Sequence, residues 1–314
     1  MKYIFFILFI FSCCSDLFAQ QDEHFTQYRF NKLLINPAYA GSKNCISSTL
    51  SGRYQWVGFE GAPVTQAISI HGPVLKKHLG LGIHIINDRV GQFGKSSIVT
   101  SYAWHLRSRF GNLAMGLQAS VVQARFFGSK LNITNNNDPL LPVADQSAWV
   151  PDAAFGLYYY FRSFYVSLSG LHLTESEFNY SSLENTTIGQ LSRHFYGVTG
   201  YNIEFSPDLI LNVNGFVKYV QPAPIQYDIN MNLIINNVFW TGLSYRSDDA
   251  ASFLVGYYIN ERLRFGYSYD YTISQLSGYN SGSHEIMLAY DVLKIGSKYS
   301  SFNLPKLRRY KEGE

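Results

Sequence analysis

The sequence predicts an all-β chain that closes into an antiparallel transmembrane barrel of about fourteen strands. Segments of about ten residues alternate apolar and polar positions along most of the chain, which is the period of a β-strand. After residue 20, no segment has the run of roughly eighteen apolar residues that a spanning helix needs. The composition agrees, because 16% of the 314 residues are aromatic and only 15% are charged, whereas a soluble domain has about a quarter charged residues.

The alternation is clearest in the second half of the chain. From Tyr227 to Leu233 every second residue is apolar, and the residues between them, from Asp228 to Asn232, are polar. A similar pattern recurs over residues 262–272 and 284–292. Each segment has the length of a membrane-spanning strand, on the order of ten residues. A soluble β-sandwich is the alternative fold, but sandwiches seldom sustain so many long strands.

Turn residues divide the chain into strands whose connections alternate in length. Bacterial outer-membrane barrels have short periplasmic turns and longer outer loops. The longer connections, which include 88–96, 128–149 and 175–192, are therefore expected outside. The expected strands are 47–57, 64–74, 79–87, 97–107, 113–126, 150–161, 164–174, 193–205, 208–220, 225–235, 238–246, 251–260, 262–272 and 284–295.

The presequence, the range of the strands and the basic end together divide the chain into four regions. Residues 1–19 are expected to be a signal peptide that is cleaved after Ala19, and the alternative is a lipoprotein signal with Cys13 as the modified residue. After cleavage a single thiol remains, which excludes a disulfide framework and a cysteine metal cluster. An even number of strands places both ends of the mature chain in the periplasm. The regions are the signal peptide at 1–19, a periplasmic or plug-like segment at 20–46, the barrel at 47–295 and a basic periplasmic tail at 296–314.

Several short motifs in the first third of the chain resemble, in the same order, those of a known family. They are Gln27-Tyr28-Arg29-Phe30-Asn31, Ile35-Asn36-Pro37-Ala38-Tyr39-Ala40-Gly41, Arg53-Tyr54-Gln55-Trp56 and Tyr102-Ala103-Trp104-His105. With these motifs the chain resembles the PorP/SprF outer-membrane proteins of the type IX secretion and gliding machinery. The residues that carry the family signature are Asn36, Pro37, Tyr39, Gly41, Gln55 and Trp56.

The resemblance implies a function in the outer membrane of a Gram-negative bacterium. The implied role is the secretion or cell-surface attachment of a cargo protein such as a gliding adhesin. The implied partners are the cargo or its C-terminal domain, other components of the machinery, and outer-membrane lipid. The residues by themselves leave two alternatives open, namely an outer-membrane channel and a hydrolase with a lumenal carboxylate site.

The signature stretch 36–41 has two interpretations. The interpretation we favour is a bend that leads the chain from the periplasm into the first strand, with Tyr39 packed against the barrel mouth. The proline and the glycine of this stretch support a bend. The other interpretation is a docking segment for periplasmic machinery, or a small plug.

Strand parity predicts which side chains face the lumen. If Ile70 and Trp104 face lipid, the residues that alternate with them face inward. Closure places the last strand beside the first, so Arg53 and Glu285 are expected to pair. The predicted lumen-facing polar residues are Arg53, His71, His84, His105, Arg107, Asp228, Arg264, Asp270, Glu285 and Asp291.

The sequence contains no recognisable catalytic motif. The eight histidines form no HxxxH pair, and neither a G-x-S-x-G motif nor a phosphate-binding loop occurs. We therefore expect no enzyme activity, no cofactor and no metal, and the small net charge of +3 gives no reason to expect a nucleic acid. We expect protein binding through the outer loops, since aromatic anchors commonly dominate interface energy. The candidate partner-binding residues are Leu140, Leu141, Trp149, Phe178, Tyr180 and Leu183.

Overall fold

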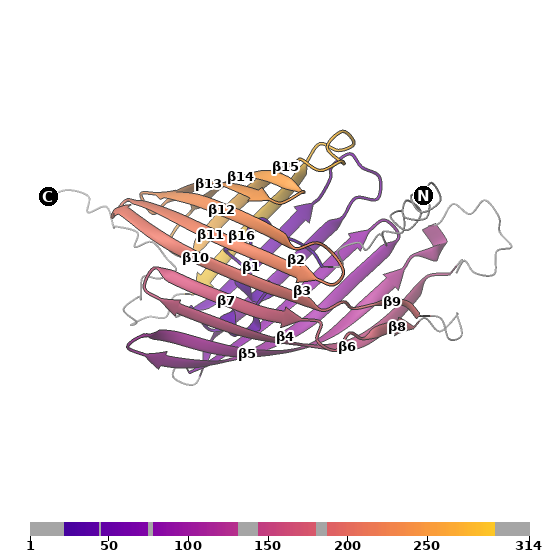
Figure 1. Cartoon of the computed structure of the whole chain (residues 1–314), viewed down its shortest axis with the longest axis horizontal. Helices are drawn as coiled ribbons and strands as arrows, with labels where there is room; N and C mark the ends of the chain where they lie inside the picture. The colour runs from indigo at the N-terminus through magenta and orange to yellow at the C-terminus, as the bar shows by residue number, and fades with distance from the viewer. Residues whose placement is uncertain (1–21, 44, 75–77, 131–143, 180–186, 293–314) are drawn as a thin grey trace, which may run out of the picture.

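Fourteen antiparallel strands form a closed barrel in the computed structural model (Figure 1), which describes residues 22–43, 45–74, 78–130, 144–179 and 187–292. The predicted fold class is confirmed. Consecutive strands are neighbours around the barrel, and β1 pairs with β16 to close it. The barrel strands are β1 (Ile46–Tyr54), β2 (Val64–Val74), β3 (Leu79–Val90), β4 (Phe93–Ser108), β5 (Gly111–Phe126), β6 (Gln146–Phe161), β7 (Phe164–Leu171), β10 (His194–Ser206), β11 (Leu209–Val220), β12 (Gln226–Ile235), β13 (Phe239–Arg246), β14 (Ala250–Tyr258), β15 (Leu263–Thr272) and β16 (Ser283–Val292).

The remaining described elements are short. Strands β8 (Glu177–Asn179) and β9 (Thr187–Gln190) form a separate two-stranded sheet beside the barrel. Three 3-10 turns complete the list, namely η1 (Lys32–Leu34), η2 (Pro37–Tyr39) and η4 (Gly128–Lys130). Among the described residues, no helix is both long enough and apolar enough to cross a membrane.

The two faces of the barrel wall follow the alternation of the sequence. On β12 the side chains of Asp228 and Asn230 are buried inside, whereas those of Tyr227, Ile229 and Met231 are exposed on the outside. This is the reverse of a soluble protein, and it arises because the outer face contacts lipid while the lumen is polar. The large apolar side chains of the outer face include Leu50, Ile68, Ile83, Leu117, Phe155, Leu243 and Phe253.

The barrel has two distinct ends, which we call the loop end and the turn end. The loop end carries the long connections 127–145 and 172–193, and β8 and β9 extend from it (Figure 1). The turn end carries the short connections 162–163, 207–208 and 236–238. The described chain leaves the barrel wall at the turn end, because Val292 of β16 pairs with the first residue of β1.

Three strands extend further at the loop end than the sequence predicts. The expected outer loop 88–96 is wrong, because β3 and β4 continue their ladder to the pair Val90–Phe93 and are joined only by Gly91 and Gln92. Similarly, β6 begins at Gln146 and not at residue 150. In both places polar residues such as Asn87, Arg89 and Ser147 take outward-facing positions, and they hide the alternation that marks a strand.

Candidate functional site

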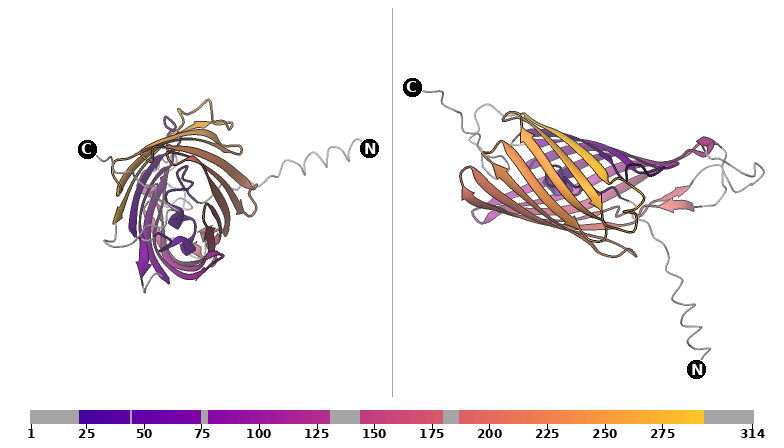
Figure 2. Two further views of the ribbon diagram at one scale, coloured as in Figure 1. Left: turned by 90° about the vertical axis from the view of Figure 1, so that its left-hand side faces the viewer. Right: turned by 90° about the horizontal axis from the view of Figure 1, so that it is seen from above.

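The segment ahead of β1 runs through the interior of the barrel, and we call residues 22–43 the lumenal segment. Asp22 contacts His172 and His194 at the loop end. At the turn end, Lys43 Nζ lies 3.4 Å from Asp291 Oδ1. Figure 2 shows the segment enclosed by the barrel wall.

The path of the lumenal segment differs from the expectation that both ends of the mature chain lie on the same side. The first described residue, Asp22, lies at the loop end, whereas β16 ends at the turn end. The whole of the expected tail, residues 296–314, lies outside the described residues, as do residues 1–19. The segment crosses the lumen because its buried aromatic and polar side chains find partners along its whole length.

Aromatic packing fixes the middle of the lumenal segment. Tyr39 packs edge-on against Tyr158 of β6, with ring centroids 5.3 Å apart. The ammonium of Lys32 lies 3.7 Å from the ring centroid of Tyr165, a cation–π geometry. Tyr28 packs against Phe216, with ring centroids 5.0 Å apart. Each anchor comes from the segment and each partner from the wall, so the segment and the barrel share one core.

The family-signature residues at 36–41 hold the segment by hydrogen bonds. The side-chain amide of Asn36 donates to the carbonyl of Leu157 at 2.8 Å, and its oxygen accepts from the backbone N–H of Ala38, also at 2.8 Å. Pro37 opens the 3-10 turn that contains Tyr39. The backbone N–H of Gly41 donates to Nδ1 of His71 at 3.1 Å. The stretch bends as the favoured interpretation expects, but it does so within the lumen and not at the mouth.

The other two signature residues lie outside the lumenal segment. Strand β1 ends at Tyr54, so Gln55 and Trp56 belong to the connection between β1 and β2 at the loop end. Trp56 adopts a left-handed conformation there, with φ of 48°.

A second anchor is a charged network around the start of the lumenal segment. Arg53 lies 2.7 Å from Asp270 and 3.3 Å from Glu285, so the pair expected from barrel closure is present. The backbone N–H of Thr26 donates to the same Glu285 carboxylate at 2.7 Å. All of these groups are almost fully buried, where each charge requires a partner.

The other two predicted lumenal carboxylates, those of Asp291 and Asp228, also have cationic partners. Asp291 accepts from Arg264 at 2.6 Å and from Ser47 at 2.5 Å. Asp228 lies 3.6 Å from Arg246 and accepts from the hydroxyl of Ser244 at 2.7 Å. These pairs link neighbouring wall strands to one another, and Lys43 joins the lumenal segment to the same Asp291 carboxylate.

The predicted lumenal histidines also face inward. His71, His84 and His105 are buried, and Nε2 of His105 lies 2.8 Å from the carbonyl oxygen of Ala40 in the segment. Arg107 has the same parity as His105 but is exposed, because it lies close to the turn end of β4.

The structure describes two of the candidate partner-binding residues, and neither is an anchor in an outer loop. Trp149 is not in a loop: it lies on β6, where 56% of its surface is exposed on the outer face. Phe178 is buried against Val122, Val150 and Leu191, so β8 is attached to the wall and this ring is unavailable to a partner. Four further candidates lie outside the described residues, namely Leu140, Leu141, Tyr180 and Leu183.

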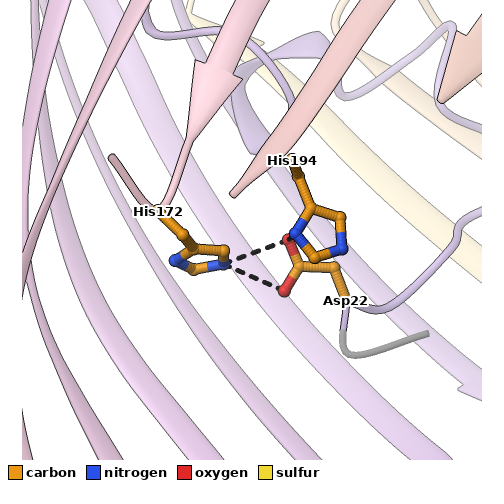
Figure 3. Close-up of side chains that lie close together, drawn as sticks. All are labelled: Asp22, His172 and His194. Atoms are coloured by element: carbon orange, nitrogen blue, oxygen red, sulfur yellow. Dashed lines mark hydrogen bonds and ion pairs between the residues drawn. The ribbon is translucent and has the colours of Figure 1, made fainter. Parts of the chain in front are cut away.

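A cluster of three side chains that no sequence motif revealed lies at the loop end. Nε2 of His172 lies 3.0 Å and 3.1 Å from the two carboxylate oxygens of Asp22, and Nδ1 of His194 lies 3.6 Å from the second of them. Figure 3 shows the three side chains converging. His172 follows β7 and His194 starts β10, while Asp22 starts the lumenal segment. No spacing motif could reveal residues that are so far apart in the chain.

Electrostatics link the members of this cluster. Burial alone would raise the pKa of Asp22, but the positive charges of His172 and Lys95 hold it well below its usual value. Burial alone would lower the pKa of His172, whereas the charge of Asp22 and the hydrogen bond to Asp152 raise it to about 9. His172 is therefore a cation at neutral pH, and it ties the start of the segment to the wall.

A closed antiparallel barrel with an apolar outer belt and a polar interior defines the class of outer-membrane β-barrel proteins. The sequence profile of the family described as "Type IX secretion system membrane protein PorP/SprF" matches residues 17–290. This match spans most of the chain, so the protein belongs to the PorP/SprF family, as its motifs predict.

The chain is also similar to solved outer-membrane structures. One is the toluene transporter TbuX of Ralstonia pickettii, with a TM-score of 0.53, 9% identity, and coverage of 83% of this chain and 93% of that chain. Another is the CymD monoaromatic hydrocarbon channel, with a TM-score of 0.52, 11% identity, and coverage of 84% and 93%. At these identities the similarity shows the fold alone. The comparison with curated proteins gave no match.

Proposed function

We propose that this protein serves the secretion or surface attachment of a type IX cargo protein, such as an adhesin, by binding protein and not by conducting or transforming a small molecule. The observation that carries the proposal is the lumenal segment. Residues 22–43 cross the whole barrel and are almost entirely buried in it. The membership of the PorP/SprF family is the reason for proposing the type IX secretion system.

The contacts of the lumenal segment argue against a permanently open channel. Around a loosely held plug the charges of the wall would be hydrated, whereas the wall residues Arg53, Glu285 and Asp291 are each at most 3% exposed and paired. Displacement of the segment would break the bonds from Thr26 to Glu285 and from Lys43 to Asp291, and it would uncover these wall charges. The buried network therefore favours a barrel that acts as a closed platform in the outer membrane.

The orientation that we propose follows from the loops. Longer connections of outer-membrane barrels face outward, so the loop end, with connections 127–145 and 172–193, would face the cell exterior. The cargo or its C-terminal domain would bind there. The turn end and the basic tail 296–314 would face the periplasm and the other machinery components, and lipid would surround the apolar belt. A signal peptide at 1–19 would direct the export.

The β8–β9 sheet is the described part of this proposed docking surface. Phe178 and Leu191 anchor it to Val122 and Val150 of the wall. Arg193 also bonds Glu175 at 2.8 Å across the base of the connection. Because the sheet is attached at its base, it extends the wall at the loop end as a defined surface.

Two loop variants in the producing bacterium test the proposal. One variant lacks residues 131–143, and the other replaces residues 178–189 with a short Gly-Ser turn, so that the Arg193–Glu175 pair is retained. A matched control shortens the connection 274–281, which lies at the same end between β15 and β16. Surface cargo and the amount of barrel in the outer membrane are both measured.

We expect the two loop variants to lose surface cargo while the barrel remains as abundant as in the control. Normal cargo display with both changes combined would contradict docking at the loop end. The channel alternative is tested on the purified wild-type protein in planar bilayers. A steady, large conductance without any added partner would contradict the closed platform.

A further inference from the structure

We propose that Asp22, His172 and His194 bind one divalent transition-metal ion of the zinc type, which fastens the start of the lumenal segment to the loop end of the barrel. Two imidazoles and one carboxylate form a ligand set that suits Zn²⁺. Their potential ligand atoms all lie within 4.8 Å of one another. This inference does not depend on the proposed role in secretion.

The ligand separations fit a single ion. Zinc binds nitrogen and oxygen at about 2.0–2.2 Å, so two ligands of one tetrahedral ion lie roughly 3.3 Å apart. The same carboxylate oxygen, Oδ2 of Asp22, lies 3.1 Å from Nε2 of His172 and 3.6 Å from Nδ1 of His194. These distances bracket the expected value, so small side-chain rotations would create the site.

The groups around the ligands are those that orient metal-binding side chains. Histidine ligands usually donate their second ring N–H to a carboxylate or a carbonyl. Nδ1 of His172 lies 2.8 Å from Asp152, whose other oxygen accepts from the hydroxyl of Thr174 at 2.9 Å. This bond leaves Nε2 of His172 directed at Asp22. The hydroxyl of Tyr196 donates to Asp22 at 3.3 Å and holds the third ligand.

His194 must change its hydrogen bonding to become a ligand. Its Nδ1 lies 2.7 Å from the carbonyl of Ser192, and its Nε2 is buried with no hydrogen-bond partner among the described residues. Binding through Nδ1 moves the ring proton to Nε2 and replaces the bond to Ser192. Ser192 lies in the irregular stretch ahead of β10, where the backbone can adjust.

The local charge balance also favours a cation. The carboxylates of Asp22 and Glu23 contact the ammonium group of Lys95, and a third carboxylate, that of Asp152, contacts His172. The second ammonium group, that of Lys218, donates to the backbone carbonyl of Asp22. Negative charge is therefore in excess before the histidines are counted.

An adjoining cavity provides space for further ligands. Its volume is about 60 Å³, and Asp22, His172, Lys95 and Tyr196 are among its lining residues. A buried water needs about 10–15 Å³ by this kind of measure, so several waters fit. Water could complete the coordination sphere. The ion would then join the lumenal segment to β7 and β10, the strands that flank the connection 172–193.

The test is metal binding to the full-length barrel in detergent, purified without a histidine tag and treated with a chelator. Zn²⁺ is titrated by calorimetry, and Co²⁺ is used as a coloured probe of tetrahedral coordination. We expect one ion per chain. His172→Gln and His194→Gln should weaken binding by at least about tenfold, and Asp152→Asn, which changes only an orienting group, by about 10- to 100-fold. His78→Gln, at the turn end, is the matched control and should bind like the wild type.

Folding of each variant is checked by the gel mobility of unheated samples. If a histidine variant does not fold, the Asp152→Asn variant and the wild-type stoichiometry decide the question. Absence of stoichiometric Zn²⁺ binding by the wild type would overturn the proposal. Equal affinity of His78→Gln and all cluster variants would overturn it as well, since the ion would then be adventitious.

Discussion

Substitution of one glycine should dislodge the lumenal segment. Gly80 of β3 faces the lumen, and a Cβ atom built on it would lie 2.5 Å from the carbonyl carbon of Ala40, 2.9 Å from Cα of Gly41, and closer still to the oxygen of Ala40. All three neighbours are backbone atoms, so no side-chain rotation can relieve the clash. In Gly80→Ala the segment must move by roughly 1 Å to restore van der Waals contact.

The cost of that movement can be estimated from the contacts that it disturbs. Overpacking of a dense core costs about 1–3 kcal/mol. The displacement also strains the bonds from His105 to Ala40, at 2.8 Å, and from Gly41 to His71, at 3.1 Å. Each buried hydrogen bond contributes about 1 kcal/mol. The expected destabilisation is therefore about 2–5 kcal/mol.

The assay is thermal unfolding in detergent, followed by the gel mobility of unheated and heated samples. Gly52→Ala is the matched control, because nothing lies within 4 Å of its added Cβ. We expect a lower midpoint for Gly80→Ala only, together with transient conductance in planar bilayers as the segment loosens. Identical midpoints for the two variants would refute the tight packing of the lumenal segment.

Two further predictions concern buried charges. Arg53→Met leaves Glu285 without its cation and leaves Asp270 with only the more distant Arg246, at 3.8 Å, so it should cost about 3–5 kcal/mol. A thermal midpoint equal to that of the wild type would contradict this network. The pKa of His172 in the folded protein is about 9, above its ordinary value of 6.5. The stabilisation that its positive charge gives is therefore fully present below about pH 6.5, and it is lost as the pH rises through about 9. In the presence of a chelator, unfolding midpoints should fall over this range by the equivalent of at most about 3 kcal/mol. The His172→Gln variant should lack this part of the pH dependence, and an unchanged pH profile would argue against the ion pair with Asp22.

The sequence predicted strand ends well at the turn end, whereas at the loop end it misplaced those of several strands in the first half of the barrel. Short turns such as 162–163 and 207–208 lie close to the expected positions. The extensions of β3, β4 and β6 were missed, because alternation marks a strand only where one face contacts lipid. Trp149 was therefore assigned to a loop although it lies on β6.

The sequence by itself determined the barrel, its number of strands, the predicted lumen-facing side chains except Arg107, and the pair of Arg53 with Glu285. Each of these follows from the two-residue alternation of side chains along a strand and from the pairing of the last strand with the first. Both can be deduced from the order of the residues in the chain. Only the tertiary structure decided the path of the lumenal segment and the meeting of Asp22 with His172 and His194. The physical reason is that an irregular segment has no period of its own. Its position is set by the shapes and charges of the wall that surrounds it, and these exist only once the barrel has closed.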